Sequence, residues 1–227
     1  MTTLRTALLA GLLALGSAAG AQDDGTDAGI AKDFAGEWQI VPADGAPVCA
    51  VTLASGDVSG GWQAAARCEG SPVAATVAWT FADGLQLRDA GGAVLMAFEE
   101  DEGAVLSSPS VAAPAFYLVP AIPGFTRLRQ PGEWAGVWRI TGKASRGPCV
   151  LRFGPPSVID GQHVGGTVTP VRCRSAALGR MDGWYLEGMD LMLTGPDDAQ
   201  IAFSPDGAAT HRSEDGRWRL APQGTGR

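Results

Sequence analysis

A six-residue tryptophan motif occurs twice in this chain and constrains what it can fold into. Residues 35–40 read AGEWQI and residues 135–140 read AGVWRI, so four of the six positions are identical. The period is too long for a solenoid unit, whereas each copy is long enough to build its own core. The sequence therefore predicts two copies of one module. The correspondence continues in order through Cys49/Cys149, Gly60-Gly61/Gly165-Gly166, Arg67-Cys68/Arg172-Cys173, Trp79/Trp184 and Ala97-Phe98/Ala202-Phe203.

Short apolar stretches at regular spacing predict that each module is a small antiparallel barrel or sandwich. The 32 glycines and 15 prolines favour turns over long helices. Strands are expected in the first copy near 38–40, 48–53, 62–68, 77–81, 85–87, 94–98, 105–106 and 116–119. They are expected in the second copy at 138–140, 150–153, 166–173, 183–186, 191–193, 199–203 and 218–220. Candidate turns are Asp160-Gly161, Asp182-Gly183, Asp206-Gly207 and Asp215-Gly216.

The first 21 residues have the pattern of a secretory signal. Arg5 precedes the apolar run Ala7–Leu15, and small residues follow at 19–21. The run is too short to span a bilayer. We therefore expect a mature protein that begins at Gln22 and is periplasmic or secreted. The predicted organisation is a signal peptide (1–21), an N-terminal trunk (22–34), a first barrel (35–119), a Pro-rich linker (120–131) and a second barrel (132–227).

The cysteines fit an oxidising compartment. Each copy contains two, and none is spaced as CxxC for zinc or redox chemistry. An even pair in each module predicts the disulfides Cys49–Cys68 and Cys149–Cys173. Closing loops of these lengths stabilises a module by roughly 3 kcal/mol on the chain-entropy model.

Charge argues against nucleic acid as a partner and separates the two copies. The formal net charge is −7. Residues 22–118 hold three Lys/Arg against fourteen Asp/Glu, whereas residues 119–227 hold thirteen against ten. The copies therefore share a scaffold but not a surface, and we expect them not to bind one partner equally well.

No pattern of catalytic residues stands out. The only histidines, His163 and His211, lie beside predicted loops and are expected at the surface. The mature chain has no HExxH and no GxSxG, and the acidic stretch 99–102 lacks the spaced ligands of a calcium loop. We therefore predict that the protein is not an enzyme and has no cofactor or metal. The repeated tryptophans are expected to be structural: Trp38, Trp79, Trp138 and Trp184. The first of each copy, Trp38 and Trp138, is expected to be largely buried.

The repeated constellation resembles the Inh family of bacterial inhibitors, which block serralysin-type alkaline metalloproteases. Together the two matching sets cover nearly all of the mature chain. In the first copy the matching residues are 35–38, Cys49, Cys68, 78–85 and 97–98. In the second they are 135–138, Cys149, Cys173, Trp184, Gly188 and 202–203.

The resemblance implies an eight-stranded, lipocalin-like antiparallel barrel with one disulfide near its start. It also implies a periplasmic inhibitor, monomeric when free, whose partner is a serralysin-type zinc metalloprotease. In that family the mature N-terminal segment enters the protease cleft and its amine approaches the catalytic zinc. The matching trunk here is 22–34, and the protease-binding residues implied are Gln22, Asp23, Asp24, Gly25, Gly36 and Glu37.

Two features depart from the family pattern. The second copy is preceded by an internal linker, which has no free amine. In addition, Gln22 can cyclise, and a cyclised terminus has no amine to donate.

The sequence is also compatible with two functions other than protease inhibition. The spacings Gly36-x-Trp38 and Gly136-x-Trp138 also resemble the opening motif of lipocalins, which hold small apolar ligands, although small barrels are mostly filled by their own side chains. The other alternative function is that of an envelope interaction module without inhibitory activity.

Overall fold

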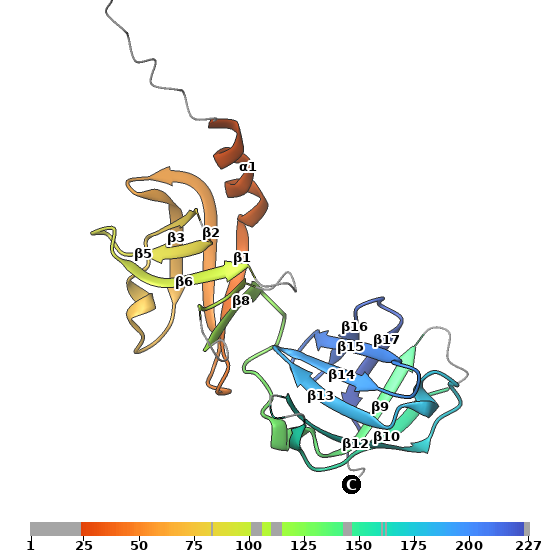
Figure 1. Ribbon diagram of the computed structural model, residues 1–227. Coiled ribbons are helices and arrows are strands. Elements are labelled where there is room, and N and C mark those ends of the chain that lie inside the picture. The colour runs from red at the N-terminus through yellow and green to blue at the C-terminus, as the bar shows by residue number, and fades with distance from the viewer. Residues whose placement is uncertain are drawn as a thin grey trace, which may run out of the picture.

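Over the residues that the structure describes, one α-helix is followed by two β-barrels in tandem (Figure 1). This computed structural model describes residues 24–82, 84–100, 106–109, 115–142, 147–159, 161 and 163–224, with side chains from residue 29 onward. Helix α1 (Asp24–Phe34) enters the first barrel directly. Within the described ranges, no helix has the length and hydrophobicity needed to cross a membrane.

The first barrel is a closed ring of eight antiparallel strands in chain order, and its last strand pairs with its first. Leu85 and Leu87 both face inward, as the two-residue period of a strand requires. The barrel interior is filled by side chains such as Trp79 and Phe98, which are almost fully buried. The strands are β1 (Gly36–Pro42), β2 (Cys49–Val58), β3 (Gly61–Arg67), β4 (Ala78–Phe81), β5 (Leu85–Arg88), β6 (Val94–Glu100), β7 (Leu106–Ser107) and β8 (Phe116–Pro120).

The second barrel repeats this ring and adds one short strand. The order is β10-β9-β17-β16-β15-β14-β13-β12, and pairing of β10 with β12 closes it, while β11 pairs only with β12. Its core has the same character, with Trp184 and Phe203 fully buried. The strands are β9 (Gly136–Gly142), β10 (Cys149–Phe153), β11 (Ser157–Ile159), β12 (His163–Arg172), β13 (Gly183–Glu187), β14 (Asp190–Thr194), β15 (Gln200–Pro205), β16 (His211–Ser213) and β17 (Trp218–Pro222).

One glycine of each repeated pair lies where β3 or β12 runs beside the strand that carries Trp79 or Trp184. A Cβ at Gly61 would lie 2.3 Å from the carbonyl oxygen of Trp79, and a Cβ at Gly165 would lie 2.1 Å from that of Trp184. Both distances are far inside van der Waals contact, so neither position accepts a side chain without moving backbone. One member of each glycine pair therefore permits close strand packing, although Gly61 and Gly165 are not at equivalent positions of the repeat.

The all-β prediction of two closed eight-stranded barrels with one disulfide each is confirmed. Two strands were not predicted, β11 and β16. The predicted turn at Asp182-Gly183 is wrong, because the Asp182 amide donates to Thr194 in the ladder and the chain reverses instead at Gly188-Met189. Asp160 and the end of the acidic stretch, 101–102, lie outside the described residues.

The disulfides allow a first prediction, because they close loops of similar length in the two copies. The sequence separations are 19 residues for Cys49–Cys68 and 24 for Cys149–Cys173. Replacing both cysteines of either pair by alanine should lower the free energy of unfolding by about 2–4 kcal/mol, mainly by freeing the unfolded chain. Urea unfolding of the two double variants measures this. Wild-type stability in either variant would contradict a structural role for that bridge.

The segment predicted to be a Pro-rich linker packs between the barrels. The Val48 amide donates to the Thr126 carbonyl over 2.9 Å, and Pro47 and Arg127 form an isolated β-bridge. A separate apolar cluster joins Val41, Tyr117, Val119 and Phe125 to Met189 of the second barrel. Backbone pairing and apolar contacts therefore hold this segment, in addition to the stiffness of its prolines.

Candidate protease-binding segment

Helix α1 is attached to the first barrel by one face of its last turns. Ile30, Ala31 and Phe34 pack against the barrel core, and Ala31 is only 1% exposed. Their spacing places them on the same side of a helix. Lys32 and Asp33 face solvent. The helix also contacts β2, and in Figure 1 it lies at the end of the first barrel away from the second barrel.

An indole–carbonyl hydrogen bond anchors the end of this helix. The indole N–H of Trp38 donates to the carbonyl oxygen of Phe34 over 2.7 Å, and the two rings stack with centroids 5.6 Å apart. Phe34 also contacts Phe81 at 5.0 Å and Trp79 at 6.0 Å. Trp38 is partly buried, and it packs against Phe34 at the edge of the core cluster.

The second barrel repeats this anchor with a shorter element. The 3₁₀ helix η2 (Pro131–Trp134) ends in Trp134, whose carbonyl oxygen accepts the indole N–H of Trp138 over 2.7 Å. The rings stack 4.9 Å apart, and the exposed fractions of Trp134 and Trp138 are 1% and 2%. Burial of Trp138 is therefore confirmed. Phe34 and Trp134 are equivalent positions that the sequence repeat did not reveal, because the two residues differ. Both are aromatic, and each lies four residues before the tryptophan that it contacts, Trp38 or Trp138.

Charged side chains fasten η2 to the segment before it. Arg127 donates to both carboxylate oxygens of Glu133, and the Gln130 amide donates to the same group over 2.8 Å. These hydrogen bonds, that of Arg127 first, lower the pKa of Glu133 to about 2. Next to them, the Arg129 guanidinium carbon lies 5.4 Å and 5.0 Å from the ring centroids of Trp134 and Trp138.

The two histidines do not both lie at the surface. His211, on β16, is 5% exposed, and its ring centroid is 4.8 Å from that of Trp134. Burial, and secondarily the charge of Arg129, lower the pKa of His211 to about 4. The surface prediction for His211 is therefore wrong. His163 is half-buried, with its ring 5.1 Å from that of Tyr185.

The predicted protease-binding residues are spread along and below α1. Gln22 and Asp23 lie outside the described residues, and Asp24 and Gly25 form the first turn of the helix. Gly36 begins β1, beyond the other end of the helix. Beside it, the exposed Glu37 accepts a hydrogen bond from the Thr52 hydroxyl over 3.0 Å. The predicted residues therefore lie at opposite ends of α1. Gly36 and Glu37 follow its C-terminal end, and Asp24 and Gly25 form its N-terminal end.

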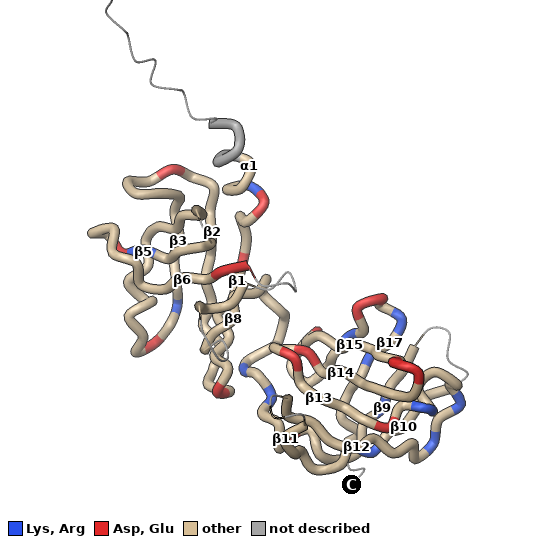
Figure 2. Tube along the Cα trace, in the orientation of Figure 1, with Lys and Arg blue, Asp and Glu red and all other residues tan. Residues whose placement is uncertain are grey.

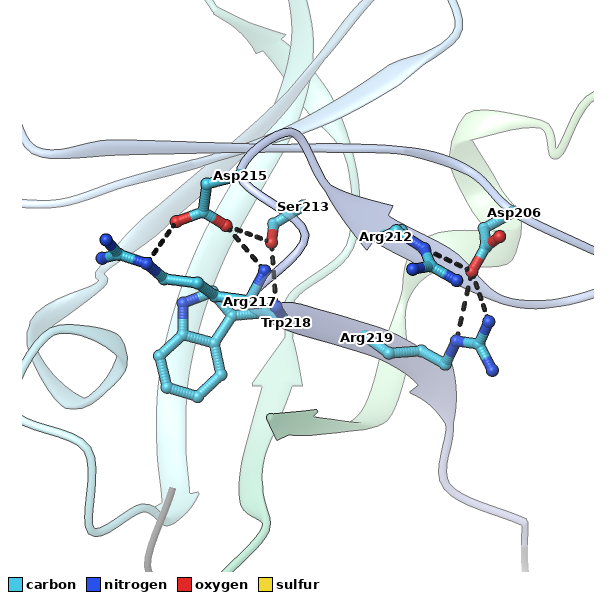
Figure 3. Close-up of polar contacts among 7 residues, drawn as sticks. All are labelled: Asp206, Arg212, Ser213, Asp215, Arg217, Trp218 and Arg219. Carbon is cyan, nitrogen blue, oxygen red and sulfur yellow. Dashed lines mark hydrogen bonds and ion pairs between the residues drawn. The ribbon is translucent and has the colours of Figure 1, made fainter. Parts of the chain in front are cut away.

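The charge difference between the copies is visible along the trace (Figure 2). Part of the arginine charge of the second barrel is neutralised on its own surface (Figure 3). Asp206 accepts hydrogen bonds from Arg212 and Arg219, and Asp215 pairs with Arg217 over 3.3 Å. Across the described ranges, His, Cys, Asp and Glu form no group that could hold a metal ion.

Comparison with known proteins assigns the first module. The family model described as protease inhibitor Inh matches residues 29–115, from the packed turns of α1 to the residue before β8. None of the curated proteins compared with this chain matches it. The second barrel has the same ring of strands, the same disulfide position and the same indole anchor, which is consistent with a tandem duplication. Over residues 29–115, the first module is therefore similar to the protease inhibitor Inh family.

Proposed function

We propose that the protein is a periplasmic or secreted inhibitor of serralysin-type zinc metalloproteases, and that residues 22–28 with the start of α1 enter the protease cleft. The family match over residues 29–115 carries the inhibitory assignment. The metalloprotease target and the compartment rest on the resemblance and on the signal-like leader. The proposed mechanism needs no catalytic chemistry from the inhibitor.

The way α1 is attached supports a role for the segment before it. The last turns of the helix pack on the barrel through Ile30, Ala31 and Phe34, and the Trp38 indole holds the final carbonyl. A rigid base of this kind lowers the entropy lost when a segment tethered to it binds, compared with a free peptide. Asp23 and Asp24 would offer carboxylates to a metal cleft if Gln22 cyclises.

The corresponding element of the second barrel is unsuited to enter a cleft. The helix η2 has four residues, follows a packed segment and ends in the buried Trp134. Glu133 and Arg127 tie it down further. We therefore assign the second barrel to spacing or docking, with its excess of basic residues available to an acidic surface.

A lipocalin-like function inside either barrel has little support. The large side chains of both interiors, among them Trp79, Phe98, Trp184 and Phe203, are 0–1% exposed and pack together. Side chains thus occupy the space that a ligand would need.

The test separates the projecting segment from the part of α1 that stabilises the barrel. A version starting at Gly29 removes 22–28 but keeps Ile30, Ala31 and Phe34. Its inhibition of a serralysin-type protease should be at least about tenfold weaker than that of the mature protein, because the cleft-binding contacts are lost. Its thermal midpoint should change little. Inhibition constants and thermal unfolding of both proteins measure this.

A matched control changes the exposed side of the helix, with Lys32→Ala and Asp33→Ala in the full-length mature protein. Undiminished inhibition by the version starting at Gly29 would overturn the trunk mechanism and leave the inhibitor assignment intact. Failure of the mature protein to inhibit any serralysin-type protease would overturn the choice of target. A version starting at Ala35 is a poor test, because it uncovers Trp38, Trp79 and Phe81.

A further inference from the structure

A cavity of about 340 Å³ lies outside both barrel interiors, where the two barrels and the segment between them meet. Most of its lining side chains are apolar, with Tyr117 from the first barrel and Leu186 from the second. Its size is at the lower end of the range for small-molecule sites, which combine an apolar wall with a few polar groups. The other lining residues include Ala43, Leu128, Arg129, Trp134, Val164 and Met189.

Arg129 is the only charged residue in this lining, and it forms no ion pair among the described residues. The nearby carboxylate, Glu133, already receives two hydrogen bonds from Arg127 and one from the Gln130 amide. Arg129 donates only to the Glu133 backbone carbonyl, over 3.4 Å. Arg129 is half-buried, and this partial loss of solvent lowers the pKa of its guanidinium. The faces of Trp134 and Trp138 compensate part of that cost.

Two buried N–H groups on the lining residues have no hydrogen-bond partner within the described ranges. They are Nε of Arg129 and Nε1 of Trp134, and Trp134 is 1% exposed. A buried donor without an acceptor is energetically costly, so such groups are uncommon. Arg129 and Trp134 both line the cavity, and Arg129 brings a positive charge to its wall. An anion in the cavity would offset that charge.

We propose that this cavity binds a small carboxylic acid with an apolar body, whose carboxylate pairs with Arg129. Arginine and carboxylate form charge-assisted hydrogen bonds, which are stronger than neutral ones and gain further from partial desolvation. The apolar wall takes the hydrocarbon part. The site is distinct from the trunk and from both barrel interiors, and it requires the two barrels together, because Ala43 and Tyr117 come from one and Leu186 and Met189 from the other.

The experiment titrates the mature protein with octanoate and, separately, with 1-octanol, which has the same chain without the charge. Isothermal titration calorimetry and tryptophan fluorescence follow binding. Octanoate should bind saturably, with an affinity at least about tenfold above that of octanol. Arg129→Gln should abolish this difference, whereas the matched control Arg139→Gln, on the exposed side of β9, should leave it unchanged.

A second variant keeps the charge and fills the cavity. Ala43→Phe, made from the first-barrel side, should weaken octanoate binding at least about tenfold while Arg129 stays in place. If thermal scans show that Arg129→Gln unfolds, Ala43→Phe still tests whether octanoate binds in the cavity. Equal binding of octanoate and octanol, or octanoate binding that survives Ala43→Phe, would overturn the proposal. Neither Arg129→Gln nor Ala43→Phe should change protease inhibition, because the proposed inhibitory segment is not part of this cavity. A failure of octanoate to bind is therefore distinguishable from a failure to inhibit.

Discussion

Replacing Trp138 by alanine is expected to lower the free energy of unfolding by about 3–5 kcal/mol, the usual range for truncating a buried aromatic side chain. Trp138 is 2% exposed, stacks on Trp134 and contacts Phe153 with ring centroids 5.8 Å apart. Its removal would also leave the Trp134 carbonyl without its donor and uncover the Arg129 guanidinium. Urea unfolding followed by fluorescence measures the loss.

The first copy supplies the matched comparison, because Trp38→Ala removes the same residue from the same place in the repeat. Trp38 makes an equivalent hydrogen bond but is only half-buried, so less apolar surface is lost and the destabilisation should be smaller. An equal loss at both sites would show that the hydrogen bond to the preceding carbonyl dominates over burial. No loss at Trp138 would contradict its place in the core.

His211 should make stability depend on pH. Its pKa is about 4 in the folded protein and 6.5 at the reference value, because burial disfavours the charged ring. Between these values the unfolded chain binds a proton that the folded chain does not. The contribution is therefore fully present above pH 6.5 and is lost as pH falls to about 4. The difference corresponds to about 3 kcal/mol.

The variant His211→Phe isolates this effect from the carboxylates that titrate in the same range. It keeps a ring beside Trp134 and removes Nδ1, which is buried without a hydrogen-bond partner among the described residues. Unfolding free energies of both proteins at pH 7 and pH 4 give the comparison. The wild type should lose about 3 kcal/mol more than the variant. Parallel pH profiles would show that His211 is protonated or exposed in the folded state.

Most strands were predictable because their apolar residues alternate or cluster between turn residues. The exceptions have physical causes. Strand β11, Ser157–Ile159, is exposed at all three positions. Its sequence therefore lacks the alternation of apolar and polar residues that marks a half-buried strand. Strand β16 is His-Arg-Ser, and its inward-facing residues, His211 and Ser213, are polar. Ser213 is stabilised there by Asp215 and the Trp218 amide, contacts that only the folded turn creates (Figure 3).

The position of the candidate segment, before Trp38, rests on the repeat and the resemblance, and neither of them indicates its conformation. The structure shows a helix that begins at Asp24, and Phe34 packs its last turn against the barrel. The role of Phe34 depends on three rings from β1 and β4 meeting at one end of the barrel. Local sequence does not encode that contact, because it forms only when the barrel closes.

The packed segment between the barrels has a consequence for how the molecule moves. Hydrogen bonds and apolar contacts join this segment to both barrels, through Val48 and Val41 on one side and Met189 on the other. The two barrels should therefore rotate together in solution. Their backbone nitrogens should share one correlation time, that of a particle with the mass of the whole mature protein, rather than the shorter times of two separate modules. A bound protease would then slow the tumbling of both barrels equally, including the one that it does not touch.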